Sequence, residues 1–146
     1  MDKKSSVRPI LLIEDNPMDL DLTLQAFKES GLTNPVEVCR DGEEALDYIE
    51  SHTSETDDKL PIIVLLDLRL PKIDGIEVLE EVKENDVWKR IPFIVMTTSR
   101  EDKDVDRAYS LGANSYIVKP ISFEAFTEVV TMIKHYWLTT NESPFK

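Results

Sequence analysis

Four hydrophobic segments of this 146-residue chain end in side chains that can do chemistry. They end in Glu14 and Asp15, in Asp67, in Thr97 and in Lys119. A buried carboxylate without partners is costly and tends to take up a proton, so Asp67, which follows five consecutive apolar residues, needs partners nearby. Carboxylates, a hydroxyl and an ammonium group in one place can bind a divalent cation and a phosphoryl group.

The three acidic residues favour a site for Mg²⁺ (or Mn²⁺), because clustered carboxylates repel one another until a cation neutralises them. Asp15 and Asp67 suit direct ligation, and Glu14 suits ligation directly or through water. A carboxylate beside such a cation can act as the nucleophile toward a phosphoryl donor and form an aspartyl phosphate. The metal, Lys119 and the Thr97 hydroxyl would then contact the phosphoryl oxygens.

Each of these residues also has an ordinary structural explanation. An acidic residue after a strand most often caps a turn or a helix, a Lys-Pro pair is usually part of a loop, and a threonine commonly caps a turn. The functional interpretation therefore depends on the combination, in which all of these residues follow strands of one consistent architecture.

That architecture is an alternation of five strands and five helices. The predicted strands cover residues 8–13, 36–39, 62–67, 91–97 and 115–120. Alternation of this kind predicts parallel strands joined by right-handed crossovers, and the uniformly apolar third and fourth strands indicate helices on both faces. The carboxyl ends of parallel strands meet at one edge, where the functional crevice of an open α/β sheet lies.

Composition limits the possible functions. A single domain suits the length, and the formal net charge of −12 argues against binding to nucleic acid or to anionic lipid. No apolar run is long enough to span a membrane. The start, MDKKSSVRP, has no apolar segment typical of a signal peptide, and Cys39 has no partner for an internal disulfide, so we expect a reducing, cytoplasmic location.

Four stretches together resemble the receiver domains of two-component response regulators. They are LLIEDNP, LLDLRLPKIDG, IPFIVMTTS and GANSYIVKP. The resemblance covers about residues 8–134 within a single domain of residues 1–146, and residues 135–146 form a C-terminal tail. It implies a flavodoxin-like α/β fold, a doubly wound five-stranded parallel sheet in the order 2-1-3-4-5 with five helices.

The resemblance also assigns roles at the site. It implies that Asp67 accepts phosphate from a histidine on a partner sensor kinase and that Glu14 and Asp15 hold Mg²⁺. The backbone carbonyl of Arg69 matches the remaining protein ligand of the metal, and Lys119 matches the lysine that contacts the phosphate. Glu14 stands where many members have Asp, which favours a contact through water.

A signalling relay is implied in the same way. Thr97 matches the switch hydroxyl and Tyr116 the aromatic switch of the fifth strand, which would move inward when Thr97 turns toward the phosphoryl group. Packing at an edge strand also explains a tyrosine at this position. Pro120 stands where the family often has a cis peptide bond, and Thr98 is bulkier than the residue often found there.

Within the family, the chain resembles the stand-alone regulators associated with bacterial phytochromes. The features are the polar segment at residues 51–59, the stretch MTTS and the aromatic tail IKHYWL. They would imply a partner kinase that responds to light. We expect no DNA-binding domain after the last helix, so the output would be protein contact.

The last helix carries two apolar stripes, which favours two neighbours. One has the 3-4-3-4 spacing of a coiled-coil seam and consists of Phe123, Phe126, Val130, Ile133 and Trp137. The other consists of Val129, Met132 and Tyr136. We predict a homodimer through this helix and its tail, including Tyr136 and Trp137. The alternative is a broad core face with a tail that folds back on its own domain. His52 and His135 are predicted to be surface residues.

Two enzyme-like or carrier-like alternatives use similar residues. A Mg²⁺-dependent phosphatase or phosphotransferase with an aspartate nucleophile commonly has a second acid two residues later, where this chain has Arg69. A flavin carrier of similar topology would need a phosphate-binding loop after the first strand, but EDNPMD is acidic. We therefore do not expect an enzyme acting on general substrates.

Overall fold

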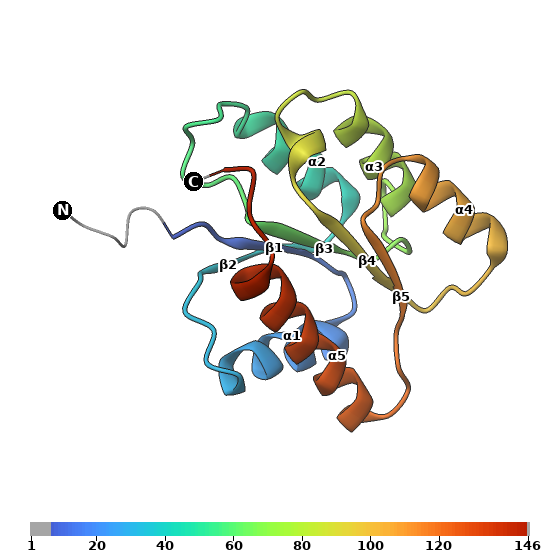
Figure 1. Cartoon of the computed structure of the whole chain (residues 1–146). Coiled ribbons are helices and arrows are strands. Elements are labelled where there is room, and N and C mark those ends of the chain that lie inside the picture. Colours follow the sequence, from blue (N-terminus) through green and yellow to red (C-terminus); the bar gives the residue numbers. More distant parts are fainter. Residues whose placement is uncertain (1–6, 146) are drawn as a thin grey trace.

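Five parallel strands form one sheet in the order β2-β1-β3-β4-β5, which confirms the predicted topology (Figure 1). The computed structural model describes residues 7–145. Most of the N-terminal segment in which we expect no signal peptide therefore lies outside the described residues. The strands are β1 (Ile10–Ile13), β2 (Val36–Cys39), β3 (Ile63–Leu66), β4 (Phe93–Thr97) and β5 (Ser115–Val118).

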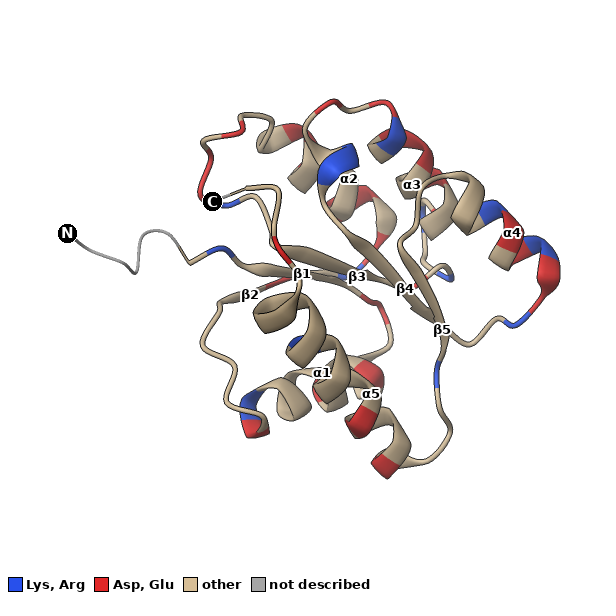
Figure 2. Ribbon diagram, viewed as in Figure 1, with Lys and Arg blue, Asp and Glu red and all other residues tan. Residues whose placement is uncertain are grey.

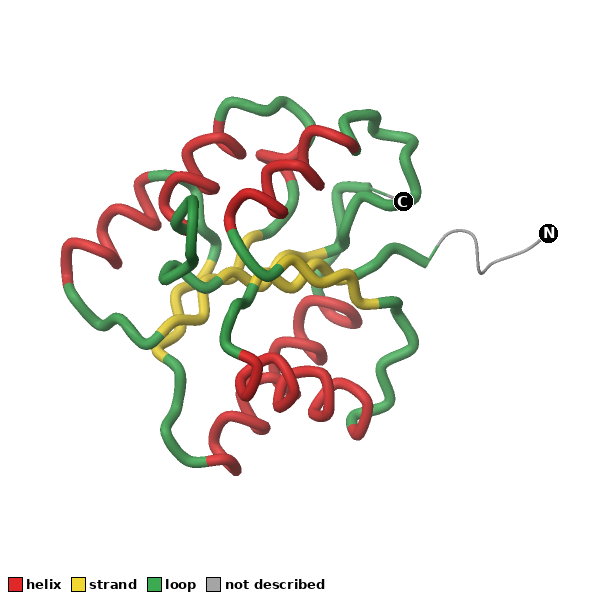
Figure 3. The backbone as a smooth tube through the Cα atoms, turned by 180° about the vertical axis from the view of Figure 1, so that it is seen from behind, coloured by secondary structure: helices red, strands yellow, loops and turns green. Residues whose placement is uncertain are grey.

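Helices cover both faces of the sheet. They are α1 (Pro17–Glu29), α2 (Gly42–Ser51), α3 (Gly75–Lys83), α4 (Asp102–Ser110) and α5 (Phe123–His135). Figures 1 and 3 show α1 and α5 on one face and α2, α3 and α4 on the other. Each face has its own hydrophobic core, and β3 is buried along its whole length, as its apolar sequence predicts.

Side-chain caps fix where most of these helices begin. Asn16 accepts hydrogen bonds from two amides in the first turn of α1, and Pro17 occupies the first helical position. Asp41 caps α2 by accepting from the amide of Glu44, and the Glu44 carboxylate accepts from the amide of Arg40, one residue before the cap. Helix α4 differs, because its capping residue makes no side-chain hydrogen bond.

The polar segment before β3 is anchored more firmly than its composition indicates. The Nδ1 atom of His52 lies 2.8 Å from Oδ2 of Asp57, and the indole of the buried Trp88 donates to the carbonyl of His52. Tyr48 donates to the carbonyl of Lys59 across the same loop. The prediction that His52 is a surface residue holds in part, because its side chain keeps 23% exposure but is bonded to Asp57 and packs beside Tyr48.

The predicted dimer seam on α5 is in large part the core of its own domain. Phe126, Val130 and Ile133 are buried against the sheet and α1, with 4%, 0% and 5% exposure. These three side chains therefore cannot form a contact between folded copies, which corrects that part of the prediction. The outward side of α5 and of the turn after it instead exposes Met132 and Tyr136, which are four residues apart. Phe123 is also exposed, but it lies at the start of α5 on the side of Phe126 and Val130.

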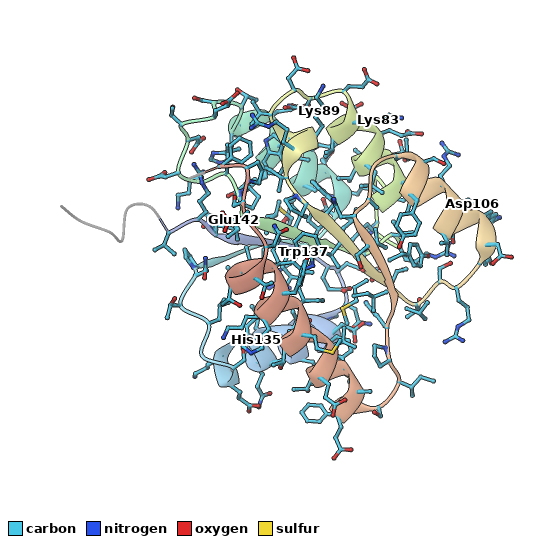
Figure 4. All side chains as sticks on the ribbon, viewed as in Figure 1. Lys83, Lys89, Asp106, His135, Trp137 and Glu142 are labelled. Atoms are coloured by element: carbon cyan, nitrogen blue, oxygen red, sulfur yellow. The ribbon has the colours of Figure 1, made fainter. Side chains whose placement is uncertain are left out.

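The C-terminal tail folds back along its own domain. After α5 comes a π-helical turn, η3 (Tyr136–Thr140), and Trp137 packs with the core that α5 covers (Figure 4). Phe145 is buried between the guanidinium groups of Arg8 and Arg90, whose carbons lie 5.6 and 4.9 Å from the centre of its ring. The alternative of a tail folded onto its own domain therefore describes this segment better than a free dimer arm.

Acidic residues occur on each of the helices α1 to α5 (Figure 2). Among the described residues, no helix is long and apolar enough to cross a membrane. His135 is exposed on α5, as predicted (Figure 4).

Candidate functional site

Asp67 lies at the carboxyl edge of the sheet, one residue beyond β3. Its amide donates to the carbonyl of Ile13, which continues the pairing of β3 with β1 and holds the side chain over the strand ends. The carboxylate is only 6% exposed. Its Oδ1 accepts from the Thr97 hydroxyl at 2.8 Å and from the Arg69 amide at 2.9 Å, and its Oδ2 accepts from Lys119 at 2.7 Å. The buried carboxylate therefore has partners on both oxygens.

Lys119 is held by three carboxylates at once. Its Nζ atom lies 2.8 Å from Glu14, 2.7 Å from Asp67 and 2.6 Å from Asp19. Burial disfavours the charged ammonium, but the hydrogen bonds to Asp19, Asp67 and Glu14 outweigh that effect and raise the pKa of Lys119 above its usual value. The lysine is therefore charged at every physiological pH.

Asp19 is a site residue that the sequence analysis missed. It stands in the first turn of α1, where the cap formed by Asn16 directs that turn toward the strand ends. The signal in the sequence was an acid four residues after Asp15, one turn into a helix that begins at the site.

Glu14 is the most strongly perturbed acid of the site. It is 5% exposed, and its Oε2 accepts from the amide of Asn16 at 3.1 Å. Burial raises the pKa of Glu14 to about 7, and the charge of Asp67 adds to this, while the bond to Lys119 acts in the opposite direction. Glu14 therefore changes its protonation near neutral pH in the absence of a metal.

The acidic residues predicted to bind metal come together. One carboxylate oxygen each of Glu14, Asp15 and Asp67 lie within 4.8 Å of one another, and Asp15 is exposed. With Asp19, the site has four carboxylates, and Lys119 supplies one ammonium group beside them. A hard divalent cation bound by oxygen ligands fits this donor set, since it neutralises the surplus and tolerates several waters. The role of the Arg69 carbonyl as a further ligand stays a prediction.

Glycines allow the loop after Asp67 to close tightly. A Cβ atom on Gly75 would lie 2.6 Å from the carbonyl oxygen of Asp67, and one on Gly42 would lie 1.7 Å from that of Ile73. Lys72 adopts a positive φ of 69° in the same loop, where Asp41 and Glu43 contact its ammonium group. This packing fixes the main chain around Asp67.

The predicted switch residues already contact the site and the next loop. Thr97 is fully buried and bonded to Asp67, and the Tyr116 hydroxyl donates to the carbonyl of Ser99 at 2.9 Å. The described conformation is thus one in which Thr97 has turned toward Asp67. No peptide bond among the described residues is cis, so the bond before Pro120 is trans, contrary to the family tendency. Thr98 is exposed.

Comparison with known proteins gives a consistent result. The family model for the response regulator receiver domain matches residues 10–131. The chain is 49% identical to the probable methanogenesis regulatory protein FilR2 of Methanothrix harundinacea, over 92% of this chain and 86% of FilR2. It is 36% identical to the response regulator Rcp1 of Synechocystis, over 98% of this chain and 97% of Rcp1.

Solved structures agree with the fold. The Mn²⁺-bound form of Rcp1 superposes with a TM-score of 0.84 at 37% identity, covering 93% of this chain and 98% of Rcp1. The phosphorylated cyanobacterial phytochrome response regulator RcpA superposes with a TM-score of 0.86 at 38% identity, covering 93% of this chain and 97% of RcpA.

Proposed function

Because the chain belongs to the family of response regulator receiver domains, we propose that it accepts a phosphoryl group on Asp67 from a phosphohistidine of a sensor kinase. The observation that carries the proposal is the buried Asp67 carboxylate, bonded to Lys119 and Thr97 beside the acidic cluster. The family model over residues 10–131 supports a receiver-domain core near residues 8–134.

The transfer needs positioning and charge neutralisation more than acid–base chemistry. An oxygen of Asp67 attacks phosphorus, the nitrogen–phosphorus bond of the donor breaks, and the imidazole nitrogen keeps the electron pair. Lys119 neutralises charge on the phosphoryl oxygens, and Thr97 can turn its hydroxyl from the carboxylate to one of them. A divalent cation, Mg²⁺ (or Mn²⁺), held by Glu14, Asp15 and Asp67, supplies further neutralisation when bound.

The geometry favours a phosphate acceptor over the alternative, a Mg²⁺-dependent phosphatase or phosphotransferase. The position where such an enzyme would hold its general acid is Arg69, and its guanidinium contacts Asp104 on α4 at 3.1 Å. Among the described residues, the side chains that bond Asp67 are the hydroxyl of Thr97 and the ammonium of Lys119, and neither is a carboxylic acid that could protonate a leaving group. Slow hydrolysis of the aspartyl phosphate is compatible with this site.

Signal output would follow from Thr97 and Tyr116 and from protein contact. Phosphorylation adds about −1.5 to −2 charge and three acceptor oxygens, which biases Thr97 toward the phosphoryl group. Tyr116, whose hydroxyl already donates to the carbonyl of Ser99, would then move inward. We propose a homodimer through the outward face of the last helix, where Met132 and Tyr136 are 64% and 51% exposed.

The kinase partner is proposed at the level of class. RcpA is a phytochrome response regulator, which supports a light-driven kinase, but the chain shares more identity with the probable methanogenesis regulatory protein FilR2. We therefore propose a sensor histidine kinase, with a phytochrome kinase as the first candidate to test, and a cytoplasmic location.

Intact mass spectrometry after incubation with acetyl phosphate and Mg²⁺ tests phosphorylation. The wild type should gain the mass of one phosphoryl group, and Asp67→Asn should not. Transfer from a purified phytochrome kinase and from other histidine kinases then identifies the partner. Continuous release of phosphate from varied esters without a stable mass gain would support the enzyme alternative instead.

Sedimentation velocity tests the dimer. Met132→Glu combined with Tyr136→Glu should dissociate it, since both changes place charge on the proposed contact. Ser51→Glu combined with Thr53→Glu adds the same two charges at exposed positions on the other face of the sheet and serves as the control. A wild type that sediments as a monomer both with and without phosphorylation contradicts the proposed interface.

A further inference from the structure

A chain of polar contacts runs from the loop after Asp67 to α4 and on to Tyr116. The guanidinium of Arg69 lies 3.1 Å from Oδ2 of Asp104, and the hydroxyl of Ser99 donates to the same oxygen at 2.5 Å. Tyr116 then donates to the carbonyl of Ser99 at 2.9 Å. This chain is separate from the contact between Thr97 and Asp67.

The Arg69 guanidinium can move away from Asp104 without loss of buried side-chain packing. Its side chain is 60% exposed, whereas that of Asp104 is 18% exposed. Asp104 keeps the hydroxyl of Ser99 as a partner when the guanidinium departs. The amide of Arg69 already donates to Oδ1 of Asp67, so this residue is bonded to the carboxylate that would carry the phosphoryl group.

Helix α4 is a suitable element to respond. Its capping residue Glu101 makes no side-chain hydrogen bond, and Ala108 is the buried residue of the helix. Asp104 belongs to its first turn, so the ion pair with Arg69 is one of the contacts that hold this end against the site. An element with so few buried contacts changes position at small cost in free energy.

We propose that Arg69 is a transferable anion clamp: Asp104 holds its guanidinium before phosphorylation, and the phosphoryl group on Asp67 takes it over afterwards. This inference rests on the proposed function. Transfer of the clamp stabilises the phosphorylated site and releases the first turn of α4. Arg69 is thus a positioning residue that couples the site to α4 through its side chain, in addition to its predicted backbone role.

Charge and geometry favour the transfer. A phosphoryl group carries more negative charge than a carboxylate and presents three acceptor oxygens, and a planar guanidinium bonds such a group with two parallel hydrogen bonds. Lys119 is already shared among three carboxylates, so it neutralises only part of the added charge. The guanidinium of Arg69, whose amide is already bonded to Asp67, can supply a second positive charge.

Release of Asp104 by Arg69 would affect Tyr116 through Ser99, which contacts both residues. The Ser99 hydroxyl contacts Asp104, and its carbonyl accepts from Tyr116, so one residue connects both groups. Loss of the ion pair changes the position of α4 relative to this residue. Phosphorylation would therefore act on the loop before α4 by two routes, one through Thr97 and one through Arg69.

The test uses beryllofluoride, a stable mimic of the phosphoryl group on a carboxylate, titrated with saturating Mg²⁺ and followed by the amide NMR signals of residues 99–106. Asp104→Asn should bind the mimic about threefold more tightly, because the competitor for the guanidinium is lost. Arg69→Gln should bind it about threefold more weakly. The double variant should match Arg69→Gln.

The double variant separates clamp transfer from a general effect of charge. If Asp104 acted only by repelling the mimic, Asp104→Asn would tighten binding equally in the Arg69→Gln background, and that result would overturn the inference. Asp106→Asn makes the same chemical change on the outer side of α4 and should leave the affinity unchanged (Figure 4). An unchanged affinity in Asp104→Asn also overturns it.

Two further outcomes are distinguished. A wild type that binds beryllofluoride and gains a phosphoryl group keeps the proposed function, whatever the variants do. A wild type that does neither overturns the proposed function and this inference together. Arg69→Lys, which keeps the charge without the planar fork, should recover less than half of the loss in affinity.

Discussion

The carboxylate of Asp19 lies 2.6 Å from the ammonium group of Lys119, closer than the 2.7 Å that separates the same ammonium from Asp67. A residue on the first helix therefore competes with the phosphate acceptor for the cation that both contact. The phosphoryl group must draw Lys119 at least partly away from Asp19. The strength of that competition sets how readily the site is phosphorylated.

Asp19→Asn should increase the phosphorylated fraction at a fixed concentration of acetyl phosphate by roughly threefold to tenfold. The change removes a competitor for Lys119 and a negative charge near the incoming phosphoryl group, and both effects act in the same direction. Intact mass at saturating Mg²⁺ measures the fraction. Asp21→Asn, an exposed position on the same helix, is the control and should match the wild type. A lower fraction in Asp19→Asn would contradict the competition.

Removal of Lys119 should destabilise the protein in a way that a divalent cation partly reverses. Lys119→Met leaves Glu14 and Asp67 buried without their cationic partner, at a cost of about 3 kcal/mol. Urea unfolding with EDTA and with Mg²⁺ measures the loss and its recovery. Lys134→Met removes a lysine that contacts only the carbonyl of Ser30 in the described structure, so Mg²⁺ should not reverse its effect.

Without a metal, stability should fall as pH rises toward neutrality because of Glu14. The folded protein raises the pKa of this carboxyl from 4.5 to about 7, so it binds the proton more tightly than the unfolded chain does. The resulting stabilisation is fully present below pH 4.5 and is lost as pH rises through about 7. Its size is at most about 3 kcal/mol. Unfolding in EDTA at pH 5 and pH 8 measures it.

Glu14→Gln is the control for this prediction, because an amide keeps the shape of the protonated carboxyl and does not titrate. The variant should lose most of the difference between pH 5 and pH 8 and should be the more stable protein at pH 8 in EDTA. Equal pH dependence of the two proteins would assign the effect to other groups.

The fold and most of the site could be predicted because strand ends in a parallel sheet converge by topology alone. Once residues 13, 66, 97 and 118 end neighbouring strands, Asp67, Thr97 and Lys119 meet without any further information. Asp19 was missed because it faces the site only through the orientation of the first turn of α1. The sequence indicates that Asn16 caps this helix, but not the direction in which the first turn points.

The two stripes of α5 show the limit of periodicity. Hydrophobic spacing identifies both stripes, but not which one faces the sheet, since the 3-4 pattern serves a domain core as well as a coiled coil. In the structure, Phe126, Val130 and Ile133 lie in the hydrophobic core. The partners of His52 were missed for a related reason, because its contacts with Asp57 and the Trp88 indole depend on how a loop closes.

The C-terminal tail should stabilise the fold of its own domain through Phe145. Phe145→Ala empties the space between Arg8 and Arg90 and loses a buried ring with two cation–π contacts, which should cost about 2 kcal/mol. Urea unfolding measures the loss, and sedimentation should show no change in oligomeric state. Thr140→Ala, an exposed change in the same tail, should leave stability unchanged. A dissociated dimer in Phe145→Ala would show that the tail joins two copies.

Gly75 should be indispensable for the position of Asp67. A Cβ atom there would lie 2.6 Å from the carbonyl oxygen of Asp67 and 2.7 Å from the Cα of Leu68, and both are main-chain atoms that cannot move aside alone. Gly75→Ala must therefore displace the end of β3, at a cost of about 3 kcal/mol and with a large loss of phosphorylation.

Gly112→Ala separates this displacement from ordinary glycine strain. Gly112 has a φ of +97° but open space around its Cα, so alanine there is strained by about 1 kcal/mol without meeting any atom of the site. It should lose stability and keep normal phosphorylation by acetyl phosphate. If Gly75→Ala also kept normal phosphorylation, the close approach to Asp67 would have no role in setting its geometry, and the loop after β3 would have to adjust independently of the carboxylate.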